Sequence, residues 1–113
     1  MKIVYIAHPI SGDITGNLKK IVKIGREINL SEPNVIPFAP YFFDCYCLDD
    51  TIPAERQRGI KNDTEWFKKD VISELRLYGD RISNGMRAEI DICKKEGISI
   101  RAMTKGTNEQ YNF

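Results

Sequence analysis

The chain has 113 residues, which suits one small domain spanning residues 1–113. Lysine and arginine number 17 and aspartate and glutamate 16, so the net charge is close to zero and does not favour a nucleic-acid polymer as partner. The hydrophobic fraction of 42% is ordinary for a globular protein and excludes a disordered or low-complexity class. A domain of this size buries about two-thirds of its unfolded surface, which leaves little material for enclosing a deep pocket.

The sequence shows neither a membrane span nor a secretion signal. No apolar run approaches the roughly 18 residues that a span needs. The apolar part of the N-terminal stretch is too short for a signal peptide and is better interpreted as a buried strand. The odd number and the spacing of Cys45, Cys47 and Cys93 suit neither a zinc site nor a redox CxxC motif. We therefore predict a cytoplasmic protein with free thiols.

The first half of the chain alternates apolar runs with a helical pattern. Ile3–Ala7 is a continuous apolar run, typical of a strand buried on both faces. A helix is expected over Asn17–Leu30, with its first residue as N-cap and Gly25 placed to approach a sheet. Val35–Ala39 is predicted to be a second strand, and Pro37 indicates an edge position.

The middle of the chain contains an aromatic stretch and then a second helical pattern. Tyr41–Glu55 is a long connection for so small a domain, so it is either functional or contains a helix. The pattern over Ala54–Lys69 predicts a helix with Ile60 and Phe67 on one apolar face.

The second half repeats the alternation and ends in a polar tail. We expect a strand interrupted by charges, a loop, a helix and a last strand: Val71–Tyr78, Gly79–Gly85, Gly85–Glu96 and Ile98–Met103. Gly97 is well placed to end the helix. The tail from Thr104 is expected to be frayed.

This order predicts the α/β class, with a short parallel sheet of four to five strands and helices on both faces, in three layers. Ligands of such folds bind beyond the carboxyl ends of the strands. That rule selects the turn His8–Asp13, the aromatic stretch after the second strand, and Gly79–Glu89.

Glu89 is the first candidate for chemistry, at the end of the segment Ser83–Glu89. A helix N-terminus favours an ionised carboxylate, and an oriented carboxylate at a sheet edge can attack an electrophilic carbon. Glycosyl transfer uses such a group. The alternative is that Glu89 only stabilises the start of its helix.

Asp63 is the second candidate. At about 100° per residue it lies on the flank of the Ile60 and Phe67 face, where an acid can hydrogen-bond or protonate a leaving base. The alternative is an ordinary solvated acid in the charged run around Lys61. His8, the only histidine, is either a site residue or a histidine satisfied by backbone. We expect no metal and no cofactor, because paired cysteines, further histidines and a phosphate-binding glycine fingerprint are missing.

These segments together resemble the nucleoside 2-deoxyribosyltransferase family, including its nucleotide N-hydrolase branch and related small domains. The resemblance covers residues 1 to about 103. It rests on the opening Val4–Gly12, on Asp63 with Trp66, and on Gly79–Glu89.

The resemblance implies a flavodoxin-like sheet that cleaves or transfers at the N-glycosidic bond of a (deoxy)nucleoside or nucleoside 5′-monophosphate. It implies that Glu89 attacks C1′, that Asp63 assists departure of the base, and that Tyr5 orients the nucleophile. The implied substrate-binding residues come from the first turn and from the start of the helix with Glu89: His8, Pro9, Ile10, Ser11, Gly12, Ser83, Gly85 and Met86.

Two departures from the family pattern concern the phosphate. Nucleotide hydrolases of the family hold the 5′-phosphate with an arginine where this chain has Ser11, and His8 stands where glycine is usual. Arg81 or Arg87 is an alternative phosphate contact.

Two non-enzymatic functions stay open beside the enzymatic one. The first is a nucleotide-binding or sensing module without turnover. The second is an interaction protein that uses the aromatic segment Tyr41–Tyr46. Because relatives often close the site with a neighbouring subunit, and because small domains often oligomerise, we expect a homodimer or larger homo-oligomer.

Overall fold

The computed structural model describes residues 1–111 of the chain. Within them, four strands and five helices alternate in the order β1, α1, β2, α2, α3, β3, α4, β4 and α5. The predicted α/β class is confirmed. No helix in this part of the chain is both long and apolar enough to cross a bilayer.

The sheet is parallel throughout and has the strand order β2-β1-β3-β4. β1 (Lys2–Ala7) lies between β2 (Val35–Phe38) and β3 (Glu74–Leu77), and β4 (Ser99–Ala102) follows β3. Pro37 lies in β2, which is an edge strand as its sequence predicts. The first, second and fourth predicted strands are therefore confirmed within one or two residues, whereas the third begins three residues later than predicted.

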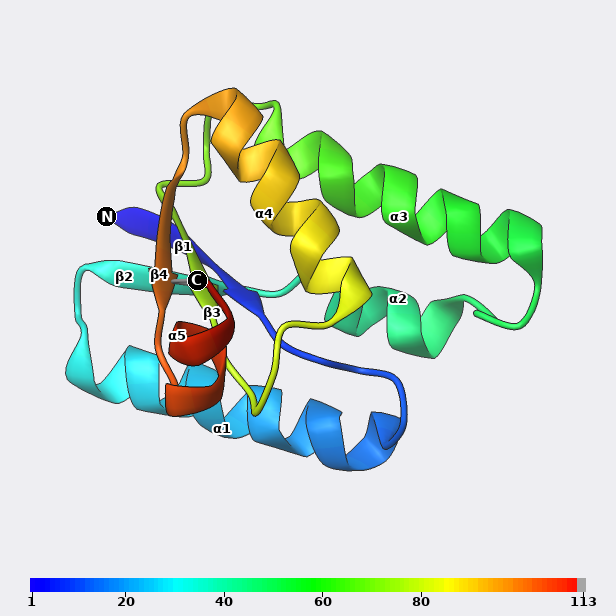
Figure 1. The fold of residues 1–113 in the computed structure, drawn as a ribbon, viewed down its shortest axis with the longest axis horizontal. Helices are drawn as coiled ribbons and strands as arrows, with labels where there is room; N and C mark the ends of the chain where they lie inside the picture. The colour runs from blue at the N-terminus through cyan, green and yellow to red at the C-terminus, as the bar shows by residue number, and fades with distance from the viewer. Residues whose placement is uncertain (112–113) are drawn as a thin grey trace.

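Helices cover both faces of the sheet, so the predicted three layers are present. Figure 1 shows α1 (Ile14–Ser31) on one side and α3 (Pro53–Phe67) with α4 (Asn84–Glu96) on the other. Side chains alternate along β1, so Tyr5 and Ala7 join the core beneath α3 and α4. That core consists of Tyr5, Ala7, Phe67, Ile72, Leu75, Leu77, Ile82, Met86, Ile90 and Cys93.

The first helix begins three residues earlier than predicted. Asp13 is the N-cap, and its carboxylate accepts a hydrogen bond from the Gly16 amide at 3.0 Å. Asn17 is buried inside the helix and donates to the carbonyl of Ile10 instead. Gly25 does not bring the helix close to the sheet, because a Cβ built there would meet no atom within 4 Å.

The aromatic stretch contains a short helix, α2 (Tyr41–Cys47), which the sequence left as one of two alternatives. α3 then presents Gly59 and Phe67 to the interior, and Asp63 lies between them on the same face. The prediction that Ile60 belongs to the buried face is wrong, since its side chain is exposed. Gly59 takes the inward position because α2 packs there against α3.

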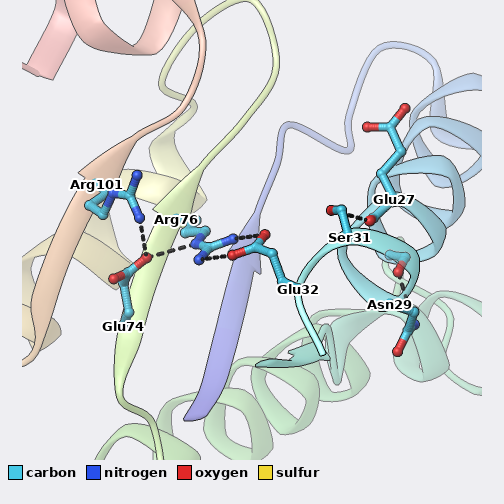
Figure 2. A network of polar contacts seen from close by, with 8 residues as sticks. Glu27, Asn29, Ser31, Glu32, Glu74, Arg76 and Arg101 are labelled. Carbon is cyan, nitrogen blue, oxygen red and sulfur yellow. Dashed lines mark hydrogen bonds and ion pairs between the residues drawn. The ribbon is translucent and has the colours of Figure 1, made fainter. Parts of the chain in front are cut away.

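The charges that interrupt β3 form a partly buried ion-pair network. The guanidinium of Arg76 donates two hydrogen bonds to Glu32, at 2.8 and 2.9 Å, and one to Glu74 at 2.7 Å (Figure 2). Arg101 of β4 lies 3.5 Å from the Glu74 carboxylate. The network connects the end of α1 to β3 and β4.

The C-terminal part ends in a docked helix. As predicted, Gly97 ends α4 in the left-handed conformation, with φ of 72°. The prediction of a frayed tail from Thr104 is wrong for the described residues, because α5 (Lys105–Tyr111) packs against β4. Thr107 is fully buried and donates to the carbonyl of Leu77. Residues 112–113 of that tail lie outside the described residues.

Candidate active site

Three candidate residues are brought together from three elements. Tyr5 comes from β1, Asp63 from α3 and Glu89 from α4. The two helices pack against each other over the sheet, and the pKa of the Tyr5 hydroxyl responds to both carboxylates. The fold therefore assembles Tyr5, Asp63 and Glu89 into one polar cluster.

Glu89 is held in a largely buried position. The residue is half-buried, its carboxyl group is the enclosed part, and burial raises the pKa of this carboxyl to about 7. An interaction with the Tyr5 hydroxyl acts in the opposite direction. The prediction that the helix N-terminus favours an ionised Glu89 is therefore corrected. Glu89 lies five residues after Asn84, in the second turn of α4, where the helix dipole has little effect.

Tyr5 is wholly buried, and its ring is surrounded by aromatic side chains. The ring centroids of Phe67, Tyr41 and Phe38 lie 4.6, 5.9 and 6.2 Å from that of Tyr5. Its hydroxyl has no hydrogen bond of regular geometry within residues 1–111. Burial, first of all, and then Glu89 keep the pKa of Tyr5 well above its usual value. Tyr5 is therefore a neutral donor beside Glu89.

Asp63 has a pKa raised to about 8. Burial is the largest cause, followed by a side-chain hydrogen bond with Asp44, by the charge of Asp44, and by Glu89. Asp63 is thus neither a solvated acid nor on the flank of the buried face, but a half-buried acid on the face itself.

Asp44 and Tyr41 belong to this cluster, and the sequence analysis did not select either as a site residue. Both lie on α2, whose helical pattern is too short to show which side chains point inward. The Tyr41 hydroxyl donates to the carbonyl of Ile6 at 2.5 Å. The available signal for Asp44 was its position as the single acid within the aromatic segment of residues 41–47.

The first turn, His8 to Gly12, is only partly enclosed. His8 and Pro9 are buried, Ile10 is half-buried, and Ser11 and Gly12 are exposed. His8 Nδ1 lies 2.7 Å from the carbonyl oxygen of Pro9, which fits a histidine satisfied by backbone. Burial lowers the pKa of His8, so this side chain is neutral at pH 7.

The start of α4 is built as a helix cap. The Ser83 hydroxyl accepts a hydrogen bond from the Met86 amide at 3.3 Å, and the Met86 sulfur lies 3.5 Å from the Ser83 amide. Met86 is buried in the core, and Gly85 is exposed. Ser83 and Met86 thus have structural roles that fix the start of the helix carrying Glu89.

Trp66 and Phe38 extend the aromatic wall of the cluster toward the surface. Their rings meet edge to face, with centroids 4.9 Å apart, and Trp66 remains 37% exposed. Such a partly exposed ring can stack on a planar base.

Two of the open grooves on the surface of residues 1–111 are lined by neither Glu89 nor Asp63. One, of about 560 Å³, lies around the amino ends of the strands, beside Lys2, Val35 and Glu74. The other, of about 420 Å³, lies between α1 and α2. Across residues 1–111, no three His, Cys, Asp or Glu side chains converge as a metal ion would require.

Comparison with known proteins places the chain in a family. Residues 2–103 match the family described as "Domain of unknown function (DUF7768)", and the chain belongs to this family. No curated protein matches the chain. The family description assigns no activity.

Proposed function

We propose that the protein cleaves or transfers at the N-glycosidic bond of a (deoxy)nucleoside or nucleoside 5′-monophosphate. Glu89 is the nucleophile at C1′, Asp63 assists departure of the base, and the Tyr5 hydroxyl orients Glu89. The acceptor is water or a second base. The sequence resemblance to the nucleoside 2-deoxyribosyltransferase family supports the same chemistry.

One observation carries this proposal: the fold gathers two half-buried acids, Glu89 and Asp63, and the Tyr5 hydroxyl into one cluster. Burial raises the pKa of both carboxyls, to about 7 for Glu89 and about 8 for Asp63. A buried pair of this kind can supply an ionised nucleophile and a protonated acid near neutral pH. Glycosidic cleavage without a metal needs this pair of functions.

The test is release of free base from a panel of deoxynucleosides and their monophosphates, followed by chromatography. We expect release by the unmodified protein, its loss in Glu89→Gln, and full retention in Asp91→Asn, which removes an exposed acid from the same helix. Asp63→Asn should lower the rate by roughly 10²–10⁴-fold. An acid-quenched reaction should show a protein heavier by the sugar, and Glu89→Gln should not.

Two results would overturn the proposal. If release persists at full rate in Glu89→Gln, Glu89 is not the nucleophile. If nucleotides bind tightly in calorimetry but no base is released over hours, the protein is a nucleotide-binding module rather than an enzyme.

A further inference from the structure

Asp44 has a buried carboxylate oxygen that needs explanation. Its Oδ2 atom is buried and has no hydrogen-bond partner in the part of the chain that the structure describes. An ionised carboxylate only accepts hydrogen bonds, and a buried acceptor without a donor is costly. Few such groups occur in folded proteins, so this oxygen calls for a hydrogen-bond donor.

The packing of α2 on α3 places Asp44 next to Asp63. A Cβ built on Gly59 would stand 3.6 Å from Asp44 Oδ2 and 3.3 Å from Leu48 Cδ1. Gly59 and Asp63 are four residues apart and share one face of α3. The two carboxyl groups are close enough to hydrogen-bond. Neither can donate unless one carries a proton, so a shared proton supplies the partner that Asp44 Oδ2 lacks.

We propose that Asp44 and Asp63 share one proton, and that Asp44 is a positioning residue that keeps this proton available on Asp63 for the departing base. This inference rests on the proposed function and adds to it the residue that controls the acid. Asp44 acts through Asp63, and the structure gives it no direct role at C1′.

Burial, Asp44 and Glu89 favour the protonated form of Asp63. The groups that interact with it are Asp44, Tyr41 and Cys45 from α2, Glu89 from α4 and Tyr5 from β1. None of these groups is a cation, and burial adds to their effect. Two carboxyls that share a site cannot both ionise easily, as in other carboxylate pairs.

The Tyr5 hydroxyl connects Glu89 to the acid pair. It is fully buried, has no hydrogen bond of regular geometry among the described residues, and interacts with both Glu89 and Asp63. A phenol carries a single proton, which Tyr5 directs toward Glu89. This agrees with the proposed role of Tyr5 in orienting the nucleophile.

The proposed step balances in protons and electrons. As the C1′–N bond breaks, its electron pair moves to the base, Glu89 bonds to C1′, and the shared proton leaves Asp63 for the base. Water or a second base then attacks C1′, and the Glu89 carboxylate leaves. The attacking group gives its proton back to the Asp44–Asp63 pair.

The test is a carbon-13 NMR titration of aspartate carboxyls in the full chain, which needs no turnover. We expect one carboxyl to titrate near pH 8 and to be absent from Asp63→Asn, which assigns it to Asp63. In Asp44→Asn the midpoint should fall by at least about one pH unit, because an amide donates to the ionised form of Asp63 and removes a like charge. Asp50→Asn, which removes an exposed acid after α2, should leave it unchanged.

The kinetic readout is the pH profile of base release. In Asp44→Asn the alkaline limb should move to lower pH, so that the rate at pH 8 falls about fivefold or more while the rate at pH 6 changes little. Asp44→Ser is the second variant if Asp44→Asn does not fold. An unchanged Asp63 midpoint in the folded variant would overturn the shared proton. If the Asp63 midpoint shifts but neither the unmodified protein nor its variants release base, the shared proton is supported and the proposed function fails.

Discussion

Burial of the Glu89 carboxyl group opposes its ionisation, because a carboxylate is more stable in water. A raised carboxyl pKa means that the folded protein keeps a proton that the unfolded chain has lost. The ionised form of Glu89, the proposed nucleophile, therefore weakens the fold. Tyr5, which interacts with Glu89 from β1, offsets part of this effect.

The stability of the fold should therefore respond to Glu89 in a pH-dependent way. Between the ordinary glutamate pKa of 4.5 and the folded value of about 7, stability should fall as the pH rises. Glu89→Gln removes the ionised form at similar size, so it should stabilise the fold by about 1–3 kcal/mol at pH 8 and change it little at pH 5. Urea unfolding at both pH values measures this, with Asp91→Asn as the control.

Equal effects of Glu89→Gln at pH 5 and pH 8 would contradict the raised pKa. So would a loss of stability at pH 8, because a neutral amide cannot be worse there than a buried charge unless Glu89 is ionised at little cost.

At the scale of elements, the sequence predicted the strands and helices whose hydrophobic pattern is long enough to identify them. The apolar runs of β1 and β2 and the helix with Gly97 at its end were found because each carries a long run or a clear stop signal. Asp13 was missed as the cap of α1 because Asn17, another good capping residue, stands four residues later.

The sequence left α2 as one of two alternatives and did not predict α5, for different physical reasons. α2 has seven residues and no interior that is fully buried, so its stability comes from packing against α3 rather than from its own pattern. α5 is polar and is held by hydrogen bonds to its side chains. For example, the Ile82 amide donates to the Gln110 side-chain oxygen at 2.7 Å. For this reason Glu89 and Asp63, which lie on long helices, could be selected as candidates from the sequence, whereas Asp44 on α2 was not.

The Arg76 network should be a main source of cohesion between elements. The Arg76 side chain is 5% exposed. Arg76→Met would leave the buried Glu74 carboxylate with only its longer contact to Arg101. We expect a loss of about 3–5 kcal/mol in the free energy of unfolding, measured in urea. Arg101→Met removes a contact of an exposed side chain and should cost less than about 1 kcal/mol.

The double variant Arg76→Met with Glu74→Met separates lost pairing from lost packing. It should recover much of the stability, because no buried charge is then left alone. If Arg76→Met costs no more than Arg101→Met, the network does not hold β3 to α1.

At the scale of the whole molecule, apolar side chains remain on the surface around α1 and α2. Ile14, Val22, Phe43 and Tyr46 are each more than half exposed. The groove between the two helices lies in the same region. α2 also carries Asp44, so this surface adjoins the element that completes the acid pair. A small domain with such an apolar surface gains stability when another subunit covers it.

We propose that the covering subunit is a second copy of the chain, as the sequence analysis expected. Light scattering at micromolar concentration should then give at least twice the single-chain mass of 13.0 kDa. Phe43→Glu places a charge on α2 and should return the mass to that of one chain, because burying an unpaired carboxylate is costly. Leu30→Glu, an equally exposed position at the far end of α1, should leave the assembly intact. A single-chain mass for the unmodified protein would exclude the second copy, and an assembly that survives Phe43→Glu would place the interface elsewhere.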